Sequence, residues 1–251
     1  TAGKAITSGD GNTIIGASAG NTTTDVDKAV IIGQNAGQAN MTADADGTIA
    51  IGYQAGKAIT SGRYNTAVGY EALKTTTEQD YNTAIGYKAL TVASGSAGTG
   101  ENTAVGYYAG TTTTTAYRNT LLGAYAGTSL TTGFVNTLIG VRAGSTLSTG
   151  TNNIVIGYGA MYQSPTSNTN VAIGNDAMYY GTAAATYNVV IGHGAGIRMS
   201  NVASTQNVYV GNNAGYNATG SYNVFMGYEA GKGGTTSAPY SSGGSNTAVG
   251  Y

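Results

Sequence analysis

The sequence contains no cysteine and no tryptophan, and it has only two prolines and two phenylalanines. Without cysteine the chain has no disulfide framework and no thiolate that could act as a nucleophile or a metal ligand. Charged residues make up 8% of the chain, against roughly 25% in an average soluble domain. A formal net charge of −1 gives no basic surface for nucleic acid or an anionic membrane. No apolar run approaches the ~20 residues of a transmembrane helix, so we expect no membrane insertion.

Residues typical of catalytic or metal sites are also scarce. His193 is the single histidine, and nothing resembling a catalytic triad flanks it. Asp25 and Asp27, and then Asp44 and Asp46, alternate as at the start of a calcium-binding loop, but no Glu follows at the loop-closing distance. Solvated turns are the better interpretation of these aspartates. We predict that the chain is not an enzyme, with no catalytic residues, no cofactor and no metal site.

Glycine and tyrosine are abundant instead, with 41 and 20 residues, and they belong to an internal repeat. Residues 64–73 read Tyr-Asn-Thr-Ala-Val-Gly-Tyr-Glu-Ala-Leu and return almost unchanged at residues 81–90. One glycine marks each of fourteen copies, which are 16 to 23 residues apart and most often 17. These repeat glycines are Gly16, Gly33, Gly52, Gly69, Gly86, Gly106, Gly123, Gly140, Gly157, Gly174, Gly192, Gly211, Gly227 and Gly250. So steady a spacing is typical of a solenoid.

The residues before each repeat glycine follow the pattern of a β-strand. The residue directly before it is always aliphatic, and the residue three before it is always Thr, Val or Ile, which favour strands. Because side chains alternate along a strand, these two positions share a face. Before Gly69 we expect Thr66 and Val68 to point into the core, and Ala67 to lie on a second, less constrained surface. We therefore predict an all-β fold, a parallel β-solenoid of about fourteen coils.

Two further positions are nearly constant among the copies. Asparagine stands four residues before the glycine in twelve of the fourteen copies, where it suits a corner and where stacked amides would form a hydrogen-bonded ladder. Alanine stands three residues after the glycine in every copy that extends that far, which indicates a wall without room for a larger side chain. In three central copies these structural positions are Asn65, Gly69, Ala72, Asn82, Gly86, Ala89, Asn102, Gly106 and Ala109.

The position directly after the glycine supplies the weak candidates for ligand binding. Four consecutive copies carry tyrosine there, namely Tyr53, Tyr70, Tyr87 and Tyr107. Because coils stack about 4.8 Å apart, these rings are expected to form a stripe. The stripe is either a half-buried packing ladder or a surface that stacks sugars or contacts proteins. By the same reasoning Glu71 and Lys88 are lateral neighbours and form an ion pair. The long connectors 91–101 and 232–245 are expected to be loops.

The two ends of the chain lie within the repeat. Residues 2–9 are identical to residues 55–62, and the chain stops one residue after Gly250. Neither end resembles the polar cap that solenoids need. We expect residues 1–251 to form a single repeat array, cut at both ends from a longer array or continuing into neighbouring subunits.

Copies such as Asn170-Val171-Ala172-Ile173-Gly174 and residues 82–86 resemble the head repeats of trimeric autotransporter adhesins, the YadA-like head, and repeats of phage tail fibres. The resemblance covers essentially the whole chain. It implies a left-handed β-roll, a homotrimeric rod, and an extracellular, adhesive role at a cell surface or on a virion fibre. It provides no catalytic residues.

Together these patterns predict a structural and adhesive extracellular fibre segment that self-associates, as a homotrimer and end to end. A host-surface glycan or protein is a possible partner. The alternative is a carbohydrate-binding receptor-recognition module that uses the tyrosine stripe and the long connectors. Loss of glycan binding after Tyr70→Ala and Tyr87→Ala would support that alternative. A third hypothesis is ice binding, which is suggested by threonine-rich connectors such as residues 111–115. Ice binding would be detected as thermal hysteresis.

Overall fold

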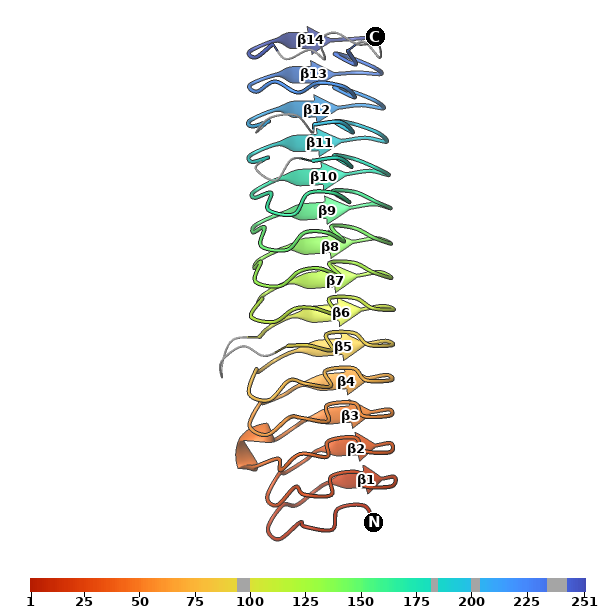
Figure 1. Ribbon diagram of the computed structural model, residues 1–251, viewed down its shortest axis with the longest axis vertical. Coiled ribbons are helices and arrows are strands. Elements are labelled where there is room, and N and C mark those ends of the chain that lie inside the picture. The colour runs from red at the N-terminus through yellow and green to blue at the C-terminus, as the bar shows by residue number, and fades with distance from the viewer. Residues whose placement is uncertain (94–99, 182–184, 200–203, 234–242) are drawn as a thin grey trace. The chain divides into compact units, whose positions relative to one another are not determined.

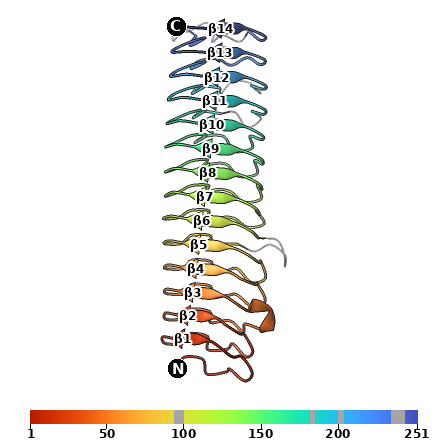
Figure 2. The same ribbon diagram turned by 180° about the vertical axis from the view of Figure 1, so that it is seen from behind.

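A computed structural model of the chain describes residues 1–93, 100–181, 185–199, 204–233 and 243–251. The chain divides into two compact units, Thr1–Ala124 and Tyr125–Tyr251. Each unit is a parallel β-solenoid with one three-residue strand per coil (Figure 1). Figure 2 shows from behind the connectors that return each coil to its next strand. The described residues contain one 3₁₀ turn, Ala43–Ala45, and no helix with the length and apolar character that crossing a membrane requires.

Every predicted strand is present, and each ends directly before a repeat glycine. The first unit contains β1 (Thr13–Ile15), β2 (Val30–Ile32), β3 (Ile49–Ile51), β4 (Thr66–Val68), β5 (Thr83–Ile85), β6 (Thr103–Val105) and β7 (Thr120–Leu122). The second contains β8 (Thr137–Ile139), β9 (Ile154–Ile156), β10 (Val171–Ile173), β11 (Val189–Ile191), β12 (Val208–Val210), β13 (Val224–Met226) and β14 (Thr247–Val249). Within each unit every strand pairs in parallel with the next. The prediction of about fourteen coils corresponds to fourteen strands. Each unit contains six complete turns between its first and last strand, so the two units together contain about twelve.

The repeat glycine is required for two independent reasons, as Gly69 shows. Its φ of +136° lies where side chains are strongly disfavoured. A Cβ at this position would also overlap the carbonyl oxygen of Gly86 in the next coil. The other repeat glycines also have a positive φ in this range. The chain can therefore turn out of each strand only because the residue there is glycine.

The strand faces are the reverse of those predicted. The middle residue of each strand points into the coil: Ala67 and Leu121 are fully buried, whereas the adjacent Leu122 is 46% exposed. The prediction that Thr66 and Val68 point inward is wrong, because both lie half-buried on the outer face of the sheet. Alternation along the strand was predicted correctly, but the variable middle position belongs to the core. Its residue type varies because it fills whatever volume the rest of the coil leaves.

Two connector positions complete the core, and in eight coils their sizes compensate. Leu73 is fully buried and is accompanied by the small Thr76, whereas the neighbouring coil has Gly56 and the buried Ile59 at the same positions. A Cβ at Gly56 would lie 2.9 Å from Ile59 Cδ1, so the Ile side chain occupies the space that a larger residue at position 56 would need. The same alternation recurs in the pairs Leu90/Ala93, Gly127/Leu130, Gly144/Leu147, Met161/Ser164, Met178/Gly181 and Gly196/Met199.

The asparagine ladder is confirmed in each unit. Asn82 is fully buried; its backbone N–H and its Nδ2 donate to Asn65 Oδ1 over 2.9 and 3.2 Å. Its own Oδ1 accepts from Nδ2 of Asn102 over 3.1 Å. The first unit extends this ladder to Asn119, and the second contains Asn136, Asn153, Asn170, Asn188, Asn207, Asn223 and Asn246. Every rung therefore satisfies a buried amide and fixes the register of adjacent coils.

The alanine wall is confirmed as well, and threonine adds polar rungs outside it. Ala72, Ala89 and Ala109 are fully buried. In the connectors, Thr60 Oγ1 donates to the carbonyl oxygen of Thr77 over 3.2 Å, and Thr131 Oγ1 donates to that of Ser148 over 3.1 Å. Threonine in these connectors therefore bonds one coil to the next.

Candidate functional site

The tyrosine stripe of the first unit exists as a stacked ladder. The ring centroids of Tyr53 and Tyr70 are 4.9 Å apart, those of Tyr70 and Tyr87 are 5.1 Å apart, and those of Tyr87 and Tyr107 are 5.3 Å apart. Because the rings stack, each interior ring has both faces covered by its neighbours and presents mainly its edge and hydroxyl to solvent. This geometry favours the packing interpretation over a sugar platform, which needs a free ring face.

A charge cluster lies beside this ladder. Glu71 Oε1 accepts from Lys74 Nζ over 2.9 Å, and Glu71 Oε2 lies 3.6 Å from Lys88 Nζ in the next coil. The predicted lateral ion pair is therefore confirmed. The hydrogen bond from Lys74, with the charges of both lysines, lowers the pKa of the Glu71 carboxyl group. Lys88 also lies 5.8 Å from the ring centroid of Tyr108.

The early aspartates form hydrogen bonds between coils. Asp27 Oδ1 accepts from the backbone N–H of Asp10, and Asp46 Oδ1 accepts from that of Asp27, each over 2.7 Å. Asp44 pairs with Arg63 over 2.7 Å at an exposed position. These contacts agree with the interpretation of the aspartates as turn residues. The described residues contain no group of three or more His, Cys, Asp or Glu side chains placed to hold a metal ion.

The outer face of the sheet is apolar in the second unit. From β9 to β13 both outward positions of every strand are apolar, and we call these residues the outer strand face: Ile154, Ile156, Val171, Ile173, Val189, Ile191, Val208, Val210, Val224 and Met226. All ten are half-buried or exposed. In the first unit, by contrast, threonine takes the first outward position of β4 to β7. The outer strand face has no charged residue, which is unusual for a surface that meets water.

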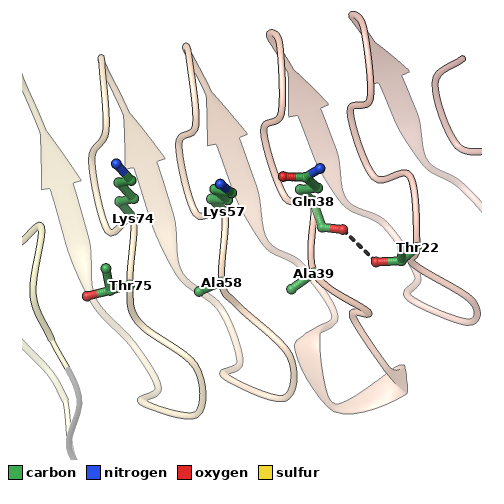
Figure 3. Close-up of a pocket in the computed structure, with 7 residues that line it drawn as sticks. All are labelled: Thr22, Gln38, Ala39, Lys57, Ala58, Lys74 and Thr75. Atoms are coloured by element: carbon green, nitrogen blue, oxygen red, sulfur yellow. Dashed lines mark hydrogen bonds between the residues drawn. The ribbon is translucent and has the colours of Figure 1, made fainter.

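Surface hollows lie along the connectors, beside the fifth and sixth residues after each repeat glycine. In the first unit a hollow of about 490 Å³ runs across four coils. Figure 3 shows its lining residues: Thr22, Gln38, Ala39, Lys57, Ala58, Lys74 and Thr75. Lys57 and Lys74 come from successive coils, and small side chains lie beside them. Lys74 already binds Glu71, which leaves Lys57 as the other cation of this hollow.

The corresponding connectors of the second unit form aromatic hollows. One, of about 280 Å³, contains Tyr125, Arg142 and Tyr162 with serine and threonine residues. The other, of about 320 Å³, we call the Asp176 groove; its lining residues are Tyr158, Asp176, Tyr179, Tyr180, Ile197, Arg198 and Tyr216. Sequence reasoning missed it because, of its tyrosines, only Tyr158 directly follows a repeat glycine, and the neighbouring copies carry Val141 and Asn175 at that position.

Asp176, which lines this groove, also packs against Gly159 of the preceding coil. A Cβ at Gly159 would lie 2.5 Å from Asp176 Oδ1, so the carboxylate occupies the space that a side chain there would fill. Tyr179 stacks on Tyr162 at 5.0 Å and meets Tyr180 edge-on at 4.6 Å. Burial, together with the neighbouring tyrosines and Asp176, raises the pKa of the Tyr179 hydroxyl. One sequence signal marks the site: among the copies, only Gly159 and Gly194 place glycine two residues after the repeat glycine.

The remaining sequence predictions concern the single histidine and the two long connectors. His193 is exposed beside Gly194. The central parts of the long connectors 91–101 and 232–245 lie outside the described residues. Comparison of the chain with protein-family models, curated proteins and solved structures found no match.

Proposed function

We propose that the chain is a structural, adhesive extracellular fibre segment whose copies associate through the outer strand face. The observation that supports this proposal is the run of ten apolar residues on β9 to β13 at half-buried or exposed positions. Contiguous apolar surface of this kind usually marks an interface. Burial of this face against another copy would be favourable by roughly 25 cal/mol per Å² of apolar surface removed from water.

The occupant that fits this face best is the same face of another copy. Its side chains repeat at the coil spacing of about 4.8 Å, so a second copy presents the same spacing and the same chemistry. Three copies close in a cyclic arrangement when this face of each copy meets the faces of both others around a common axis. The number three follows from the resemblance to trimeric adhesin heads, as do the extracellular location and the adhesive role. The proposed function requires no cofactor and no catalytic residue.

Substitutions on the outer strand face test the proposal. Changing Ile156, Ile173 and Ile191 together to threonine keeps β-branched side chains but removes apolar surface. We expect this variant to lose association in analytical ultracentrifugation while keeping the circular dichroism spectrum of the parent. The matched control changes the same three residues to valine and should associate like the parent. Equal association of the threonine variant and the parent would exclude this face as the interface.

A further inference from the structure

We propose that Met226 is a site of reversible oxidation that controls association through the outer strand face. Hydrogen peroxide would convert its thioether to a sulfoxide and thereby weaken the contact between copies. The oxidation itself can be observed whether or not the chain self-associates. Its effect on assembly rests on the proposed function, which assigns the outer strand face to a contact between copies.

The first step of the argument is that Met226 carries the most accessible sulfur atom of the chain. The sequence has five methionines and no cysteine, and the structure describes all five methionines. Met41, Met161, Met178 and Met199 are fully buried, whereas 42% of Met226 is exposed. Because peroxide in solution reaches an exposed thioether before a buried one, Met226 should be oxidised first.

The second step is the position of Met226 within the outer strand face. It is the last residue of β13 and lies beside Val210 of β12 and Val249 of β14. Its side chain points outward, because Phe225 in the middle of the strand is the residue buried in the core. Valine side chains have no donor for a sulfoxide oxygen. The oxidised side chain would therefore find no partner among its lateral neighbours on this face.

The third step is the chemistry of the oxidation. The sulfur donates an electron pair to one oxygen of hydrogen peroxide, an S–O bond forms, and the O–O bond breaks. The other oxygen leaves as water after taking the proton of the first, so sulfur is oxidised and peroxide is reduced. The product is a polar side chain in place of an apolar one. Pressed against the apolar face of another copy, its oxygen would lose hydrogen bonds to water and gain none.

Peptide mass spectrometry after treatment of the full chain with hydrogen peroxide tests the modification site. We expect Met226 to gain one oxygen atom while the four buried methionines stay unoxidised. At protein concentrations where sedimentation shows assembled chains, the oxidation of Met226 should slow, because another copy covers its sulfur. Oxidation of the buried methionines at the same rate would overturn the proposal, and so would an equal rate for Met226 in dissociated and assembled protein.

Analytical ultracentrifugation of the oxidised chain tests the effect on assembly. We expect oxidation to raise the dissociation constant of the assembly at least about tenfold while the circular dichroism spectrum stays that of the parent. Methionine sulfoxide reductases A and B, one for each sulfoxide epimer, should restore the parent value. Met226→Gln places a polar side chain at this position without peroxide and should weaken association in the same direction.

Met226→Leu is the matched control, since leucine keeps an apolar side chain of similar size without the sulfur. It should associate like the parent both before and after peroxide treatment. An oxidised parent that associates as tightly as the untreated one, or a Met226→Leu variant that peroxide dissociates, would overturn this proposal and leave the outer strand face as the interface. A parent that remains a single chain at tens of micromolar would instead overturn the proposed association, and with it the control by Met226.

Discussion

At the residue scale, the pair Leu73 and Thr76 and the pair Gly56 and Ile59 show how one coil shape accepts different sequences. In each pair one large side chain fills the core, and it enters from either of two connector positions. Leu73 does so with a φ of +48°, a conformation that glycine adopts more readily. In these coils one large side chain can therefore fill the core from either position, so volume matters more than residue type.

Moving the large side chain from position 73 to position 76 should preserve stability where the single changes do not. Leu73→Gly alone leaves a cavity and should cost about 2–5 kcal/mol, and Thr76→Leu alone should cost about 1–3 kcal/mol by overpacking. The double variant reproduces the Gly/Leu pairs found at Gly127 and Leu130 and at Gly144 and Leu147, so it should lose less than about 1.5 kcal/mol. Urea unfolding measures all three. A double variant as unstable as the sum of the single variants would show that the two positions do not share one space.

At the element scale, adjacent coils are joined by rows of identical or complementary side chains. The Asn82 rung buries its amide between Asn65 and Asn102, while Glu71 joins Lys88 of the next coil at a half-buried position. Strands of only three residues contribute few backbone hydrogen bonds each. These side-chain rows therefore help to hold the register of the coils.

The Glu71 cluster gives this arrangement a pH dependence. The pKa of Glu71 is lowered in the folded state, chiefly by the hydrogen bond from Lys74. Its stabilisation is therefore present above the unfolded-state pKa and is lost as the pH falls through the lower folded-state pKa. Glu71→Gln should lower the free energy of unfolding at pH 7 by about 0.5–1 kcal/mol, and this difference from the parent should vanish in strong acid.

Denaturant unfolding over a range of pH measures this effect, and Glu101→Gln is the control. Glu101 pairs with Arg118 over 2.6 Å, but both side chains are largely exposed, so its replacement should change stability less. If the Glu71→Gln difference stayed constant from neutral to acid pH, charge pairing would not be its cause.

The repeat predicted the location of every strand, because a glycine that no other residue can replace follows each one. It did not predict which strand face is inside. Uniform aliphatic residues such as Val68 and Ile85 resemble a core, but they form the outer face, whereas the variable Ala67 and Tyr209 are buried. The Asp176 groove was missed for a related reason: it depends on Gly159 leaving space beside a carboxylate from the next coil, which no single copy reveals.

At the scale of the whole molecule, the scarcity of charge bears on the proposed association of copies. Few ionic groups oppose contact between copies, and the outer strand face contains none. Association through apolar side chains should persist at high salt, since screening weakens only charge pairs. The proposed homotrimer and the prediction of one continuous array over residues 1–251 both concern this scale.

The native mass of the full chain tests the central claim most directly. Native mass spectrometry or sedimentation equilibrium at tens of micromolar distinguishes a single chain from an assembly without a label or a substitution. Association through the outer strand face predicts a particle of three times 25.0 kDa that persists at high salt. A particle of 25.0 kDa under the same conditions would contradict the account.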